Sequence, residues 1–116
     1  GDYSLKDIIS HINGWNIQRI KELNSFSSGE KIKIISDFDK FNSKSIEVRR
    51  KHSFSVVFKE FQESSKSLVK AFQNVPEGLW TKKIWKNKSH TPLKWLEIDT
   101  DHLKEHLKII LREMGN

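Results

Sequence analysis

The chain carries its apolar residues at helical spacing in three long segments. The first covers about residues 5–23, the second follows Ser53 and ends near Asn74, and the third runs from Pro92 to about Glu113. A helix that is apolar on one face needs a partner to cover that face. We therefore predict an all-α fold in which these helices form a bundle, with residues 1–116 as a single domain.

Capping and helix-breaking residues mark the ends of these segments. A side chain that can cap a helix N-terminus precedes each of them: Ser4, Ser53 and Thr91. Asp7 completes a capping-box pattern with the first cap, and Pro92 occupies the first helical position after the last one. Pro76 and Gly78 both oppose a helix, so the second long helix should end before them.

The intervening stretches are less regular. Residues 24–29 are rich in Ser, Asn and Gly and are predicted to form a loop. A short helix is predicted at about residues 37–50, although Ile32, Ile34 and Ile35 before it also suit a strand. The aromatic and lysine-rich stretch 79–90 has no clear period, and we predict only a connection there.

Composition limits the classes of protein and of site. Hydrophobic residues make up 35% of the chain and charged residues 31%, which favours a folded protein over a disordered chain. No apolar run is long enough to span a membrane, and no signal-like start is present, so we expect a cytoplasmic protein without membrane association. The chain has no cysteine, so a metal site must use His, Asp or Glu.

Two histidines on the last predicted helix lie where hydrocarbon is expected. His102 and His106 fall along the edge of its apolar face, together with Trp95 and Asp99. Residues four apart on a helix have Cβ atoms about 5–6 Å apart, so both imidazoles could reach one cation. The spacing equally fits two inward histidines that hydrogen-bond to neighbouring side chains.

Further ligands would have to come from other positions. Asp99, one turn before His102, could be a ligand or an acceptor that orients an imidazole. His11, one turn before Trp15 on the first helix, is the candidate third ligand because it lies at the rim of that helix's apolar face. His52 and His90 stand beside predicted helix starts and are given no role.

Several of these residues also form a family resemblance over nearly the whole chain. The stretch from Ser4 through His11 to Trp15 resembles the motif that opens the second helix of DinB-like proteins. Four further stretches resemble the DfsB and ClbS branch in the same order: Phe41-Asn42, Arg49-Arg50 before Ser53, Thr91 to Trp95, and His102-Leu-Lys-Glu-His106-Leu. The resemblance implies a four-helix bundle with a divalent metal, zinc or nickel, on His11, His102 and His106, and with Asp99, Trp15 and Trp95 around it.

The resemblance also implies a range of activities. It favours a metal-dependent enzyme, a thiol-dependent transferase or a hydrolase acting on a small reactive molecule, in which the metal lowers the pKa of a coordinated water or thiol. The alternative is a metal-free protein of the ClbS type that binds a toxic small molecule or confers resistance to it. Both readings predict a small-molecule partner.

A nucleic-acid partner is the hypothesis with the least support. Basic residues and two tryptophans are available for it: Arg49, Arg50, Lys51, Lys82, Lys83, Lys86, Lys88, Trp80 and Trp85. The net charge of +6 is spread along the chain, however, and no recognised nucleic-acid motif accompanies these residues.

The resemblance predicts one more long helix than the sequence contains. In the family a helix precedes the motif that begins here at Ser4. Without it, part of the apolar surface of the bundle should remain uncovered. We expect that the missing helix lies upstream of Gly1, that it has been lost, or that a second copy in a homodimer takes its place.

Overall fold

The computed structural model describes residues 4–33, 35–82 and 91–113. Within the last helix, the side chains of residues 102, 106, 107, 109–111 and 113 are outside this description. The described chain forms α1 (Leu5–Ser27), α2 (Phe38–Glu47), α3 (Phe54–Gln73), the 3-10 turn η1 (Glu77–Leu79) and α4 (Pro92–Glu113). It contains no strand, so the predicted all-α class is confirmed for these residues.

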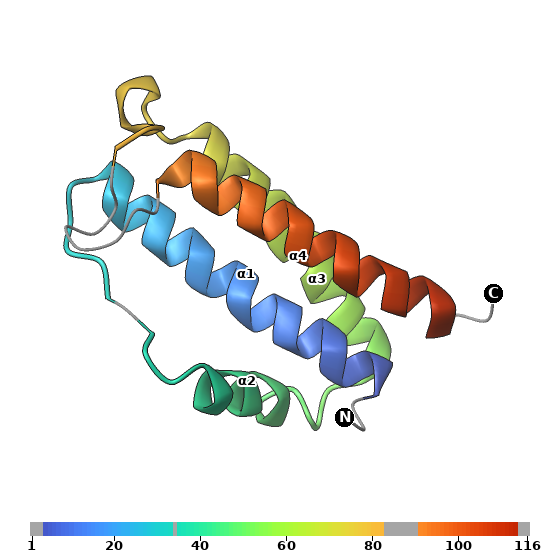
Figure 1. Ribbon diagram of the computed structural model, residues 1–116. Coiled ribbons are helices and arrows are strands. Elements are labelled where there is room, and N and C mark those ends of the chain that lie inside the picture. The colour runs from blue at the N-terminus through green and yellow to red at the C-terminus, as the bar shows by residue number, and fades with distance from the viewer. Residues whose placement is uncertain (1–3, 34, 83–90, 114–116) are drawn as a thin grey trace.

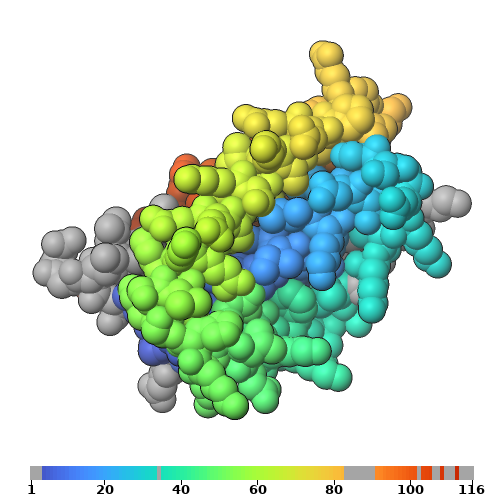
Figure 2. All heavy atoms as spheres, turned by 180° about the vertical axis from the view of Figure 1, so that it is seen from behind, coloured from blue at the N-terminus to red at the C-terminus, as the bar shows by residue number. Residues whose placement is uncertain are grey.

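The three long helices lie side by side, and the short α2 packs against α1 (Figure 1). α1 contacts α2, α3 and α4 and is therefore the central helix. α1 and α3 run in the same direction, because the segment after α1 returns along the molecule to α2 before α3 begins (Figure 1). α4 runs antiparallel to both. Figure 2 shows from behind how α3 follows α1 along its length.

Caps define the helix starts as predicted. The Ser4 hydroxyl accepts from the Asp7 amide at 3.1 Å, and the Asp7 carboxylate accepts from the Ser4 amide at 3.3 Å. The Ser53 hydroxyl accepts from the Val56 amide at 3.3 Å and begins α3 in the same way. The capping box and the Ser53 cap are confirmed.

Two boundaries differ from the prediction. α1 continues to Ser27 through residues predicted as loop, because Phe26 packs against the buried cluster at this end of the bundle and outweighs the turn preference of its neighbours. α2 ends at Glu47, before the predicted end at about residue 50. The end of α3 at Gln73, before Pro76 and Gly78, is as predicted, and a 3-10 turn follows at Glu77–Leu79.

Two buried clusters hold the helices together. At the end of the bundle where α4 begins, one cluster joins residues of α1, α3, the segment after α3, and α4: Leu23, Ala71, Phe72, Val75 and Trp95. At the other end, Ile9 and Ile12 of α1 pack on Val57 of α3. Trp95 is only 1% exposed, and α4 is thus anchored in the core by its first turn.

Part of the apolar surface stays exposed. On α4, the side chains of Leu93, Leu96 and Ile98 are 45%, 37% and 36% exposed. On α3, Val56 and Val69 are more than half exposed. The described helices therefore leave individual apolar side chains on α3 and α4 partly exposed.

Candidate functional site

The facing sides of α1 and α4 carry a cluster of charged groups around Arg19. The Arg19 guanidinium donates through Nε and Nη2 to the two carboxylate oxygens of Asp99, at 3.0 and 3.2 Å, and through Nη1 to Glu22 at 2.9 Å. The same guanidinium lies 4.0 Å from the centre of the Trp95 ring. The Arg19 guanidinium thus forms charge-assisted hydrogen bonds with one carboxylate of α1 and one of α4. It also makes a cation–π contact with the buried Trp95 indole.

The two carboxylates of this cluster are in different surroundings. The Glu22 side chain is 6% exposed and the Asp99 side chain 23% exposed. Burial raises the pKa of the Glu22 carboxyl above its usual range, against the opposing effect of the Arg19 charge. Glu22 is therefore a buried acid that binds a proton more readily than an ordinary glutamate.

The contacts of Asp99 and Trp95 define the register of α4 on α1. Asp99 is bound by Arg19, and Trp95 lies in the same buried cluster as Leu23. Both helices rise about 1.5 Å per residue and they run in opposite directions. Each step of one residue toward the C-terminus of α4 therefore corresponds to a step of one residue toward the N-terminus of α1. Positions 102 and 106 of α4 are thereby level with positions 16 and 12 of α1, and His11 adjoins the second of these.

His11 lies on the same side of α1 as Trp15. At about 100° per residue it projects roughly 40° from Trp15 and 80° from Arg19, so Trp15, which faces α2, lies between His11 and the Arg19 that contacts α4. The His11 side chain is half-buried. His102 and His106 lie on the α4 helix, but their side chains are outside the described residues, so the imidazole geometry of the predicted metal site is not defined.

Among the described side chains, no group of three or more His, Asp or Glu residues is arranged to hold a metal ion. Asp99, predicted as a ligand or as an acceptor for an imidazole, has both oxygens hydrogen-bonded to Arg19. Trp95 stands against the Arg19 guanidinium and fills the core. Asp99 and Trp95 therefore take part in the α1–α4 contact, and both precede His102 and His106 along α4.

Trp15, also predicted to surround the metal, faces α2. Its indole Nε1 donates to the Asn42 side-chain oxygen at 2.6 Å, and its ring packs on Phe41 with centroids 4.4 Å apart. Gly14 allows this close approach, because a Cβ there would lie 2.7 Å from the Cβ of Ser45. The Trp15 and Phe41-Asn42 stretches of the family resemblance thus meet at the α1–α2 contact.

A second buried ion pair fixes the α2–α3 turn. Arg49 donates from Nε and Nη2 to the Glu60 carboxylate at 2.6 and 2.9 Å, and from Nη1 to the Ser45 carbonyl at 2.8 Å. Asn13 of α1 donates to the same carboxylate at 2.8 Å. The hydrogen bonds from Arg49 lower the pKa of the Glu60 carboxyl despite its partial burial.

The basic residues considered for nucleic acid do not form one surface in the described part of the chain. Arg49 is buried on Glu60, whereas Lys82 follows the opposite end of α3. The Trp80 indole donates to the Val75 carbonyl at 3.2 Å and does not stand free for stacking. The remaining members, Lys83, Trp85, Lys86 and Lys88, lie outside the described residues.

Sequence reasoning missed Arg19, Glu22 and Glu60. Each lies in a helix among other charged residues, where a solvated position is the usual expectation. Arg19 and Glu22 are spaced i, i+3, which allows an ion pair but gives no sign of burial or of a partner on α4.

No helix among the described residues is long and apolar enough to cross a membrane. Comparisons with protein-family models, with curated proteins and with solved structures found no match to this chain.

Proposed function

We propose that the protein is a metal-dependent enzyme of the DinB-like superfamily, a thiol-dependent transferase or a hydrolase that acts on a small reactive molecule. His11, His102 and His106 would hold the metal, zinc or nickel. The observation that supports the proposal is the contact of Arg19 with Asp99 and Trp95, from which we expect position 106 to be level with position 12, next to His11, and position 102 to lie one turn away.

The chemistry of the donor set fits a catalytic cation. Three imidazoles are a common ligand set for zinc and leave a further position open for a small molecule. When bound, such a cation lowers the pKa of a coordinated water or thiol and so supplies a nucleophile at neutral pH.

Residues of the chain position the helices that carry these histidines. Arg19 and Trp95 hold the first turns of α4 on α1, so that the histidine-bearing turns follow at a set level. Asn13 donates to the Val57 carbonyl of α3 at 3.0 Å, which puts the half-buried Phe58 near the same level. Phe58 packs against the buried cluster of Ile9, Ile12 and Val57 between α1 and α3.

The proposal is tested by elemental analysis of protein purified without a metal-affinity column. We expect about one zinc or nickel per chain in the wild type and loss of that metal in His102→Ala. His52→Ala is the matched control, since His52 is exposed at the α2–α3 turn, and it should retain the metal.

If metal is absent from wild type and variants alike, and added zinc is not bound, the enzyme hypothesis is wrong. The metal-free small-molecule binding or resistance protein of the ClbS type is then the reading to pursue. Equal loss of metal in His52→Ala would show that the bound metal is on surface histidines.

A further inference from the structure

An open hollow of about 750 Å³ lies at the corner where α2 turns into α3. Its lining includes basic side chains from the helix, Lys40 and Lys44, and from the turn, Arg50, Lys51 and His52. Glu47 is the one acidic residue in the lining. Four lysine and arginine side chains thus line the hollow together with one carboxylate.

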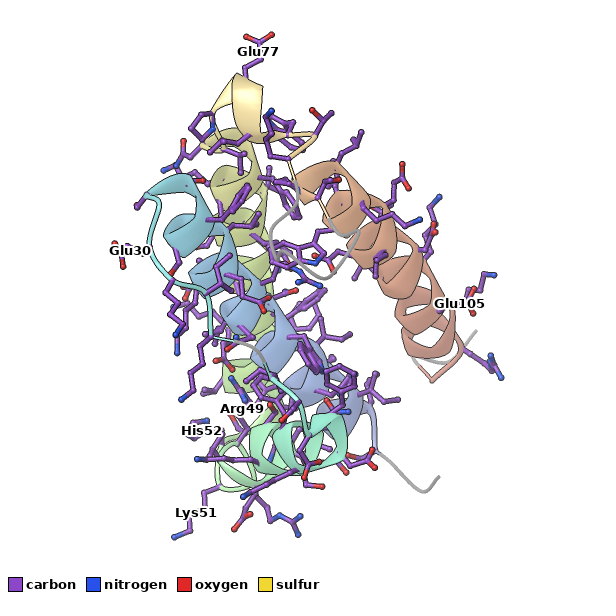
Figure 3. All side chains as sticks on the ribbon, turned by 60° about the vertical axis from the view of Figure 1, so that its left-hand side comes forward. Glu30, Arg49, Lys51, His52, Glu77 and Glu105 are labelled. Atoms are coloured by element: carbon purple, nitrogen blue, oxygen red, sulfur yellow. The ribbon has the colours of Figure 1, made fainter. Side chains whose placement is uncertain are left out.

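The turn that carries three of these side chains is held in place by the rest of the molecule. Arg49 is buried in its ion pair with Glu60, while Lys51 and His52 point outward from the same corner (Figure 3). The Arg50 amide donates to the Glu47 carbonyl at 3.1 Å. Because the backbone is already ordered, an anion that binds here would not have to order the turn.

The basic side chains of the hollow form no close ion pairs within the described chain. Lys40 and Lys44 stand four residues apart on α2, a spacing at which like charges on a helix repel each other. A bound anion would relieve this repulsion and interact with both sides of the hollow.

We propose that this corner hollow binds a small molecule that carries a multiply charged phosphate group, at a site separate from the proposed metal centre on α1 and α4. Lys40, Lys44, Arg50, Lys51 and His52 all line this one open hollow of about 750 Å³. Lys82 lies at the far end of α3 and does not line the hollow.

The test uses the full chain stripped of metal, titrated calorimetrically with inorganic pyrophosphate and with orthophosphate in buffer at physiological salt. The wild type should bind pyrophosphate at one saturable site and orthophosphate more weakly. The double variant Lys44→Gln/Arg50→Gln should bind pyrophosphate about tenfold more weakly, since it loses two charge-assisted contacts.

The charge-matched control is Lys66→Gln/Lys70→Gln, which removes two exposed lysines of α3 that do not line the hollow. It should keep the wild-type affinity. Equal weakening in both double variants would mean a general charge effect and would overturn the proposal, as would the absence of saturable pyrophosphate binding. Binding of a short DNA duplex without binding of pyrophosphate would also overturn it.

Discussion

Replacing Arg19 with methionine should remove the hydrogen bonds that join α1 to Asp99 of α4. Methionine keeps an apolar stem beside Trp95 but loses two hydrogen bonds to Asp99 and one to Glu22. A hydrogen bond to a charged group contributes about 1.5–3 kcal/mol, and the losses are not additive because the partners share one guanidinium. With side chains 16% exposed for Arg19 and 23% for Asp99, we expect a loss of about 3 kcal/mol in the free energy of unfolding.

Urea unfolding at neutral pH measures this loss, and Lys94→Met is the control. The Lys94–Glu97 pair is 3.6 Å long with side chains more than half exposed, so its loss should change stability by less than about 0.5 kcal/mol. A double-mutant cycle with Asp99→Asn should give a coupling energy of about 1.5 kcal/mol for the Arg19–Asp99 pair. If Arg19→Met costs no more than Lys94→Met, the network does not hold α4 and the register argument fails.

Three further changes test the packing and the buried acids. Gly14→Ala should cost about 1–2 kcal/mol in urea unfolding, because the new Cβ meets Ser45. The folded protein lowers the pKa of Glu60, so the ionised Glu60 contributes its full stabilisation above the ordinary pKa of 4.5, and this contribution is lost as the pH falls through the lowered pKa. In thermal unfolding, the melting temperature of Glu60→Gln should therefore fall less steeply with acid pH than that of the wild type. Glu22 has a raised pKa, so its protonation stabilises the fold as the pH falls from above its raised pKa toward 4.5. In a pH series of urea unfolding, Glu22→Gln should abolish that gain.

The helical elements could be predicted because their signals are local. Ser4, Asp7 and Ser53 act through hydrogen bonds to amides three residues away, so a short stretch of sequence contains both partners. The apolar spacing within each helix is likewise readable without knowing the neighbours. The extension of α1 to Ser27 was missed because it depends on Phe26 packing against residues far away in the chain.

The polar networks could not be predicted, because their partners are distant in sequence. Arg19 and Asp99 are 80 residues apart, and Asn13 and Glu60 are 47 apart. Helical spacing identifies Asp99 as a polar residue on an apolar edge, but it does not distinguish an imidazole partner from Arg19. The same limit applies to Trp15, whose indole hydrogen-bonds to Asn42 of α2.

The predicted metal ligands rest on helical spacing, on a family resemblance and on the register of two helices. The resemblance identifies His11, His102 and His106, and the Arg19–Asp99 contact supports their common level. The side-chain geometry of the last two lies outside the described residues, so the ligand set stays a prediction.

X-ray absorption at the zinc edge of the zinc-loaded protein tests that prediction most directly. The proposed site predicts a first shell containing three imidazole nitrogens at about 2.0–2.1 Å, reduced to two in His11→Ala. A first shell of oxygens alone, or a spectrum that His11→Ala leaves unchanged, would contradict the proposed metal centre.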